Sequence, residues 1–324
     1  MDTNTISVTH EWGTLKEAIV GINPADQLII PKYYPGLSWL KEKWTELSKK
    51  HGGKRMVDVM PEFAYGLERE IDEFADLLTK HGVKVHRMQP LAGKEATFEG
   101  EERVGLYARD PIVVIGNHVI EASLKVNVRR KERYSIRPVL DARCANNPDV
   151  KWVSMPPPSP IDDHLDKTSA FLEGGDVFVN GHEIYVGVSD VASNRKGVTW
   201  LQNYLGNNYK VHAIQLKSNV MHLDGVMGLV RPGLGIICRD LIEESTLPGE
   251  LQNFEWITVS LAEKAQFATN GCPLNKETII MAEGNDRVVK EVQQRGVEVI
   301  TMSFESGIAL GGAFRCAHHP LYRV

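Results

Sequence analysis

The sequence has little of what marks several large classes of protein. Its only cysteines are Cys144, Cys238, Cys272 and Cys316, and no C-x-x-C spacing occurs, which argues against a disulfide scaffold. No apolar run approaches the roughly 18 residues that a membrane span requires. Basic residues form no long block, since 37 Lys and Arg stand against 42 Asp and Glu, a formal net charge of −5. A nucleic-acid-binding protein normally carries a concentrated basic patch, so this balance disfavours that class.

With 324 residues, of which 42% are apolar and 24% charged, the chain has the composition of an ordinary soluble globular protein. The opening Met1-Asp2-Thr3-Asn4 lacks a basic segment followed by an apolar one, so we expect no secretory signal and a location in the cytoplasm. No Ser/Gly-rich linker divides the chain, and its one proline-rich stretch, Met155 to Pro160, predicts an extended loop. A domain boundary is therefore not visible in the sequence.

Two local patterns recur along the chain. The first is a strand, a tight glycine turn and a second strand. It predicts β-hairpins at Ile112–Glu121, Val177–Val186 and Val226–Cys238. The second is an amphipathic helix that ends at a glycine and leads into a β-rich run, as predicted at Gly82, Gly206 and Gly296. Repetition of hairpin, helix and strand along one chain predicts a modular, propeller-like α/β fold.

The segment Gly311-Gly312-Ala313-Phe314-Arg315-Cys316 is the most informative short motif. Two glycines let the backbone bend tightly just before the thiol, which can present the sulfur at a pocket. A thiol is a useful nucleophile only as the thiolate, so it needs a positive neighbour or an imidazole to lower its pKa. Arg315, His318 and His319 are close to Cys316 in sequence. The alternative interpretation is that Cys316 is an inert, buried cysteine.

Three further segments offer an imidazole and several carboxylates. If Met221 to Asp224 is a strand, His222 and Asp224 point to the same face. Glu173 and Asp176 flank two glycines at the start of a predicted hairpin, where their alternative role is to bond backbone amides of a turn. The segment Gly105 to Pro111 places Arg109 and Asp110 just before a strand, where a solvated ion pair is the alternative. For His222 and Asp224, the alternative is a surface pair.

Together these groups suit one kind of substrate. A guanidinium group is planar and cationic, and paired carboxylates bind it in a forked geometry through charge-assisted hydrogen bonds. A thiolate can then attack its central carbon.

At these residues the sequence resembles the guanidino-group-modifying enzyme superfamily, and most closely the amidinotransferases that act on arginine. The segment His10 to Gly21 is similar to their opening E-W-x-x-L-x-E-x-I-V-G, and the likeness continues at Gly105 to Ala122. It closes on His222-x-Asp224 and on Gly311-Gly312-x-x-Arg315-Cys316. Four matches in the family's order make coincidence improbable.

The resemblance implies a single domain over residues 1–324, an α/β-propeller of five ββαβ-type modules around a pseudo-fivefold axis with the active site in its central channel. It also implies roles for individual residues. Cys316 is the expected nucleophile, His222 the proton carrier and Glu173 the carboxylate that orients the imidazole. Asp110 and Asp224 are expected to clamp the guanidinium, and Arg109 to contribute to substrate binding. The family's arginine that grips the carboxylate of the donor falls close to Arg239 or Leu241.

The implied reaction is a two-step transfer. Cys316 attacks the guanidino carbon of arginine, ornithine leaves with a proton from His222, and an amidino group remains on the sulfur. An acceptor amine then removes that group. This scheme needs no metal and no organic cofactor, and its partners are a small guanidino donor and an amine, with no nucleic acid and no membrane. The oligomeric state is open, a homodimer being one option.

Two alternatives stay open. A hydrolase, either a deiminase or a dihydrolase, would use the same five residues with water as the attacking group. Glu173 and the ending Pro320-Leu321-Tyr322-Arg323 look like that branch, whereas the longer amino-terminal and central likeness favours transfer. In the other alternative His222, Asp224, Cys316 and His318 bind zinc in a catalytically inactive scaffold, although every catalytic position of the thiol chemistry is filled.

Two polar segments remain outside these motifs. Lys125 to Arg133 is basic, with Arg129 near its centre, and we expect a solvated face there, with a phosphorylated acceptor as the alternative. Asp162-Asp163-His164 follows the proline loop and is expected to be solvated, with a place at the mouth of the channel as the alternative.

Overall fold

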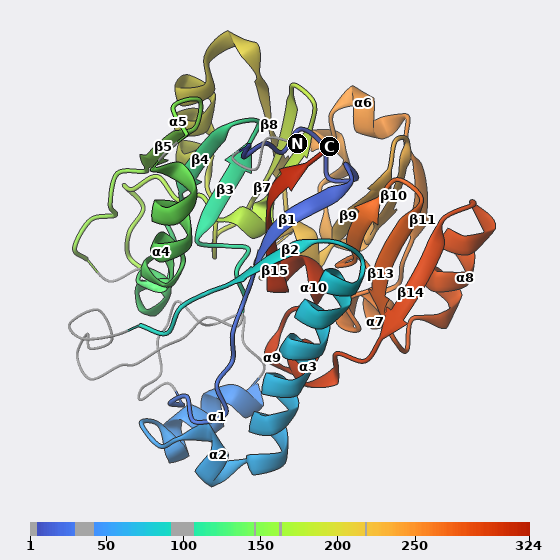
Figure 1. The fold of residues 1–324 in the computed structure, drawn as a ribbon. Coiled ribbons are helices and arrows are strands. Elements are labelled where there is room, and N and C mark those ends of the chain that lie inside the picture. The colour runs from blue at the N-terminus through green and yellow to red at the C-terminus, as the bar shows by residue number, and fades with distance from the viewer. Residues whose placement is uncertain (1–4, 30–41, 92–106, 146, 162–163, 218) are drawn as a thin grey trace.

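The computed structural model describes residues 5–29, 42–91, 107–145, 147–161, 164–217 and 219–324 (Figure 1). Gly105, Leu106, Asp162 and Asp163, which the sequence analysis includes in its motifs, lie outside these ranges. The strands in the described ranges form five three-stranded sheets.

In every sheet the middle strand has one antiparallel and one parallel neighbour, and in four of the five the antiparallel pair is a hairpin that a helical connection joins to the third strand. In the second module these elements are β3 (Ile112–Ile115), β4 (His118–Glu121), α4 (Glu132–Cys144) and β5 (Lys151–Ser154). In the third they are β6 (Val177–Asn180), β7 (Glu183–Val188), α5 (Arg195–Leu205) and β8 (Lys210–Gln215).

The next two modules repeat the pattern. The fourth consists of β9 (Met227–Arg231), β10 (Leu234–Ile237), α6 (Gly249–Gln252) and β11 (Glu255–Thr258). A short helix α7 (Leu261–Ala265) leads to the fifth, which consists of β12 (Cys272–Asn275), β13 (Thr278–Ala282), α8 (Asp286–Gln294) and β14 (Glu298–Met302). The predicted α/β-propeller of five ββαβ-type modules is confirmed.

The first module joins the two ends of the chain. Its middle strand β1 (Leu15–Val20) pairs in parallel with β2 (Lys84–Arg87) and antiparallel with the last strand, β15 (His318–Arg323). The two ends of the described chain therefore lie side by side (Figure 1). Because β15 directly follows α10 (Phe314–Ala317), closure of the ring also fixes the position of Cys316.

The connection from β1 to β2 is the longest of the five. It contains α1 (Glu42–His51), α2 (Met56–Val59) and α3 (Pro61–Lys80). Leu67, Ile71, Phe74 and Leu78 form the buried face of α3, which begins at a proline that suits the first helical turn. Figure 1 shows α1 and α2 below α3 and α9 (Glu305–Leu310), at the end of the molecule away from both termini.

The predicted turns are found where the glycines are. Gly82, Gly206 and Gly296 follow α3, α5 and α8 with φ of +78°, +66° and +78°, the left-handed region that glycine adopts without strain. The hairpin of β12 and β13 was missed, because Pro273 lies within β12 and a proline disfavours a strand interior. Among the described residues, no helix is long and apolar enough to span a membrane.

Candidate active site

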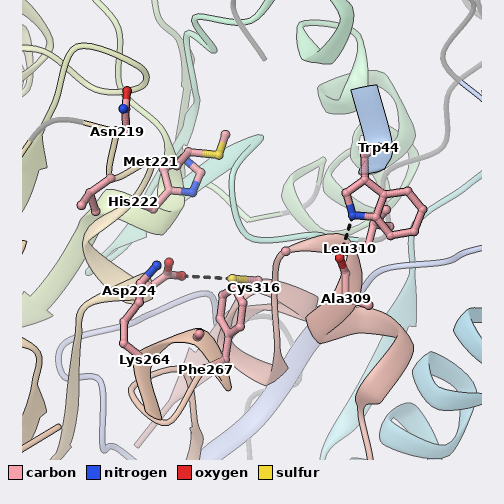
Figure 2. A pocket seen from close by; sticks show the side chains of 14 residues that line it. Trp44, Asn219, Met221, His222, Asp224, Lys264, Phe267, Ala309, Leu310 and Cys316 are labelled. Atoms are coloured by element: carbon pink, nitrogen blue, oxygen red, sulfur yellow. Dashed lines mark hydrogen bonds between the residues drawn. The ribbon is translucent and has the colours of Figure 1, made fainter. Parts of the chain in front are cut away.

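A cavity of about 190 Å³ opens between α1, α7, α9, α10 and the loop that precedes β9 (Figure 2). Cys316, His222 and Asp224 all line it. Their positions in the sequence are far apart, so the cavity brings together two of the motifs singled out above. A strand at 221–224 would place His222 and Asp224 on one face, but these residues do not form a strand. His222 is extended, but Leu223–Gly225 form a turn of 3₁₀-helix, which still leaves His222 and Asp224 on the same cavity.

The thiol of Cys316 is held by contacts to two neighbours. Its Sγ lies 3.6 Å from Oδ2 of Asp224 and 3.2 Å from Nδ2 of Asn270, which donates to it. The backbone N–H of Cys316 donates in turn to Oδ1 of Asn270 at 3.2 Å. The backbone reaches Cys316 through the predicted glycine turn, in which Gly311 at the end of α9 has a φ of +109°. Asn270, which lies in no recognisable motif, was missed.

The surroundings of Cys316 favour its protonated thiol. Burial raises the pKa of its thiol well above the usual value, and the Asp224 and Asp110 carboxylates raise it further. The cationic neighbours expected from the sequence do not offset this. His318 and His319 are buried, and their Nδ1 atoms bond the carbonyls of Phe314 and Arg109. Burial lowers the pKa of both histidines well below the usual value.

His222 lies between two carboxylates. Its Nε2 is 2.8 Å from Oε2 of Glu173, and its Nδ1 is 3.5 Å from Oδ1 of Asp110. Burial disfavours the charged imidazole, but Asp110 and Glu173 outweigh this cost and raise the pKa of His222 to about 10. The imidazole is therefore a cation at neutral pH and has a proton to donate.

Arg129 lies behind His222, Asp110 and Glu173. This position was not predicted from the sequence. Its guanidinium is 2.7 Å from Oδ2 of Asp110 and 3.6 Å from Oε2 of Glu173, and it forms a two-bond fork with Glu132. Because Arg129 is 5% exposed, the expectation of a solvated basic face is wrong at this residue. The buried cation compensates the two carboxylates that hold His222. The basic run gave no signal for such a role, because the other cations in it are only half-buried and look the same as Arg129 in the sequence.

Gly175 allows the carboxylate and the imidazole to approach the backbone. Its N–H donates to Oδ1 of Asp110 at 2.9 Å. A Cβ atom at this position would lie 2.7 Å from both Oδ1 of Asp110 and Nδ1 of His222, closer than non-bonded atoms approach. The glycine is therefore required by space rather than by its backbone angle.

A loop behind the imidazole positions the segments that carry His222 and Glu173. Asp176 accepts the N–H groups of Leu223 and Ser193 at 2.9 and 3.2 Å. The hydroxyl of Ser193 accepts the N–H of Glu173 at 2.9 Å. Burial raises the pKa of Asp176 to about 7. The alternative foreseen for Asp176, bonds to backbone amides, is thus what the structure contains.

Asp224 belongs to a second charged cluster. Its Oδ2 accepts a hydrogen bond from Arg315 at 3.1 Å, and Arg315 also bonds Glu11. Arg109 donates to Glu11 and to the carbonyls of Gly174 and Val177. Arg109 is 4% exposed and is not among the residues that line the cavity, so the structure gives it a structural role in place of the expected substrate contact.

Two other expected substrate contacts are not at the cavity surface. Arg239 pairs with Glu244 at 2.8 Å and does not line the cavity. Asp110 is buried behind His222, and both of its oxygens already have partners, Gly175 N–H and Arg129. The cationic side chains that do line the cavity in the described part of the chain are His222 and Lys264.

Metal-ligand groups do not form the zinc site considered above. The Nε2 of His318 lies 3.5 Å from the sulfur of Cys272, away from the cavity. Among the described residues, Asp110, Glu173 and His222 bring ligand atoms within 4.8 Å of one another. A metal there would have to displace the proton of His222, whose pKa of about 10 favours the cation.

Comparison with known families shows to which superfamily the chain belongs. Residues 61–323 match the family described as "N,N dimethylarginine dimethylhydrolase, eukaryotic". The chain belongs to the guanidino-group-modifying enzyme superfamily. Curated relatives cover almost all of it: an L-arginine:L-lysine amidinotransferase from Pseudomonas savastanoi pv. phaseolicola is 25% identical over 98% of this chain and 94% of its own. A mitochondrial glycine amidinotransferase from Xenopus tropicalis is 24% identical over 95% of this chain and 80% of its own.

Solved structures of this superfamily share the fold. An amidinotransferase of the saxitoxin biosynthetic pathway from Microseira wollei has a TM-score of 0.84 at 23% identity, covering 98% of this chain and 97% of its own. A dimethylarginine dimethylaminohydrolase from Pseudomonas aeruginosa has a TM-score of 0.64 at 15% identity, covering 95% of this chain and 99% of its own. The named relatives place this enzyme in the amidinotransferase branch, which confirms the resemblance seen in the sequence.

Proposed function

We propose that the protein transfers the amidino group of arginine, or of a related guanidino donor, to an amine through a covalent intermediate on Cys316. The observation that carries this proposal is the meeting of Cys316, Asp224 and the His222–Glu173 pair at one cavity. These groups supply a nucleophile, an anion for a cationic substrate, and a proton donor held in place by a carboxylate.

Binding of the guanidino donor changes the charge that surrounds the Cys316 thiol, and with it the thiol pKa. The free site holds Cys316 in its protonated form because carboxylates face it. A guanidinium bound by Asp224 places a positive charge beside the sulfur, which lowers the thiol pKa at the moment when the thiolate is needed. We expect Asp224 to contact the guanidinium directly, whereas Asp110 acts mainly by holding His222. Direct contact between Asp110 and the guanidinium of the donor, as expected from the sequence, stays a prediction.

In the first half-reaction the sulfur bonds to the guanidino carbon, and the bond from that carbon to the side-chain nitrogen breaks. His222 gives its proton to the leaving nitrogen, so ornithine departs as the amine. The thiol proton restores the imidazolium, and the amidino group on sulfur retains the positive charge of the substrate. The carboxylate of Asp224 stabilises this charge more strongly in a buried site than it would in water.

In the second half-reaction an acceptor amine attacks the amidino carbon, and the carbon–sulfur bond breaks. His222 gives its proton to the departing sulfur, which returns the thiol, and the neutral imidazole then takes a proton from the attacking nitrogen, which returns the imidazolium. Atoms and charge balance without a metal or an organic cofactor. The named relatives transfer to lysine or glycine, and the acceptor here is proposed only as an amine.

A hydrolase is the second candidate, because the matching family is named for a dimethylhydrolase and Glu173 looks like that branch. Incubation with arginine, with and without glycine, lysine and aliphatic amines, tests the choice by mass spectrometry of the products. Ornithine together with a guanidinylated amine supports transfer. Citrulline, or ornithine with urea or ammonia and no guanidinylated product, supports hydrolysis instead.

A further inference from the structure

One wall of the cavity comes from a part of the fold that the other modules lack. In the third module only a few residues separate the end of β7 at Val188 from the start of α5 at Arg195. In the first module the corresponding connection runs from Val20 to Pro61 and includes α1 and α2. Helix α1 brings Trp44 to the cavity.

Trp44 is fixed there by two contacts. Its indole N–H donates to the carbonyl of Ala309 in α9 at 2.8 Å, and its ring centroid lies 5.1 Å from that of Phe63. The side chain is buried, with 7% of the residue exposed. Figure 2 shows Trp44 beside Leu310 and Ala309, across the cavity from Met221 and His222. The indole therefore bridges an extra helix and the segment that leads to Cys316.

The lining beside Trp44 is apolar, because Ala309 and Leu310 lie next to the indole. Val220, Met221 and Phe267 add apolar surface to the rest of the cavity, which is also lined by the polar side chains of Asn219 and Lys264. The reacting groups Cys316, His222 and Asp224 line the same cavity, so the apolar side chains of Trp44 and Leu310 face the space that an amidino group on Cys316 would occupy. Apolar side chains offer water no hydrogen-bond partners, and exclusion of water in this way protects a reactive intermediate from hydrolysis.

We propose that Trp44 is the residue that keeps water from the amidino group on Cys316 and so selects transfer over hydrolysis. This inference rests on the proposed function. The side reaction it suppresses is attack of water on the amidino carbon. A carbon–oxygen bond forms, the carbon–sulfur bond breaks and urea leaves; one proton of the water returns the thiol, and the other is released to solvent with the positive charge of the intermediate.

The test needs no knowledge of the acceptor. Full-length enzyme is mixed with arginine labelled in the guanidino carbon, without any amine, and the label on protein and in urea is followed by mass spectrometry. The wild-type protein should release one ornithine per chain and keep the label on Cys316. In Trp44→Ala, the lifetime of the labelled protein should fall by about tenfold or more, with urea appearing continuously, as expected when a wall that excludes water is opened.

Trp256 provides the matched control, because its indole N–H makes the same kind of bond, to the carbonyl of Leu251 at 2.8 Å, away from the cavity. Trp256→Ala should leave the lifetime of the label unchanged. Two milder variants guard against misfolding: Trp44→Phe keeps the ring but loses the bond to Ala309, and Leu310→Ala opens the same wall from α9. Each should shorten the lifetime, by less than Trp44→Ala.

The outcomes separate the two proposals. If wild type labels Cys316 and the folded Trp44 and Leu310 variants hold the label as long as it does, the role of Trp44 is refuted and the transfer mechanism stands. If wild type forms neither ornithine nor labelled protein from arginine, the proposed function fails, and the role of Trp44 fails with it.

Discussion

The imidazole of His222 and the carboxylate of Glu173 lie 2.8 Å apart, buried, on segments separated by 49 positions in the chain. This contact, with Asp110 on the other ring nitrogen, gives the imidazole its raised pKa of about 10. It makes His222 a proton donor rather than a base before the substrate arrives.

The pH dependence of the donor half-reaction should follow this imidazole. Ornithine release should decline as pH rises through about 10, the pKa of His222. Glu173→Gln removes one negative neighbour, lowers that pKa, and should shift the alkaline limb to lower pH. The measurement is the ornithine burst as a function of pH. Glu183→Gln is the control, because Glu183 pairs with His212 outside the cavity; equal shifts in both variants would contradict the assignment.

The same group links stability to pH. The folded pKa of about 10 lies above the usual 6.5, so its contribution to stability is complete below about pH 6.5 and is lost as pH rises through 10. In His222→Asn, the free energy of unfolding should vary less over this range than in wild type. Denaturant unfolding at several pH values measures the effect, and parallel curves for the two proteins would rule out a raised pKa.

Removal of the buried cation Arg129 should damage both fold and site. Arg129→Met leaves Asp110, Glu132 and Glu173 without their shared partner, at a cost of about 3–5 kcal/mol. Arg129→Lys keeps the charge and should fold better, but it lacks the fork and should still lose activity. The control is Arg137→Met, whose pair with Glu121 is partly exposed. Full activity in a folded Arg129→Lys protein would show that charge alone suffices.

Asn270 should increase the reactivity of the Cys316 thiol. Asn270→Ala removes the hydrogen bond to Cys316 Sγ, which helps to stabilise the thiolate, so thiol alkylation should slow at a given pH. The expected change corresponds to about 1–3 kcal/mol, the usual cost of losing a buried hydrogen bond. Asn285→Ala removes a buried amide that bonds Gln266 and Ala282 instead, and it should leave the alkylation rate unchanged. A similar slowing in both variants would point to a general structural effect.

Gly175→Ala should abolish activity in a protein that still folds. The added methyl would lie 2.7 Å from Asp110 Oδ1 and His222 Nδ1 and must push them apart. Gly249→Ala is the control, because no atom lies within 4 Å of the corresponding Cβ. The readouts are thermal unfolding and ornithine release, and normal turnover in Gly175→Ala would mean that the contact between imidazole and carboxylate is dispensable.

Arg239 is a test of the donor-carboxylate contact expected from the sequence. Its guanidinium is paired with Glu244 and does not line the cavity. We therefore expect Arg239→Met to leave the KM for arginine unchanged. A large rise in KM for arginine, without one for an analogue that lacks the carboxylate, would restore Arg239 as a binding residue.

The fold was largely predictable because its signals are local. Hairpin turns such as Gly116-Asn117 and helix ends such as Gly82 specify their own conformation from a few adjacent residues. The pairing of β1 with β15 was not predictable in this way, since it depends on residues some 300 positions apart. The third strand of each module pairs in parallel with the middle strand, and no turn motif in the sequence marks such a pairing.

Cys316 and His222 stood out in the sequence because each is a rare residue type in a motif, and the structure places both on one cavity. The residues that support them, Asn270 and Arg129, could not be predicted, because their contacts with the site exist only in the folded chain. A buried arginine that compensates carboxylates looks the same in sequence as a solvated one. Arg109 shows the converse, since proximity to Asp110 in a motif suggested a substrate contact, whereas the folded chain turns it toward Glu11.

The central claim is that Cys316 carries the amidino group. The most direct measurement is one turnover of arginine, labelled in its guanidino carbon and without acceptor, followed by mass spectrometry of the peptides. The account predicts the label on the peptide that contains Cys316, one ornithine per chain, and neither product in Cys316→Ala. Ornithine or citrulline formed with no label on any peptide, or a label that persists in Cys316→Ala, would contradict it.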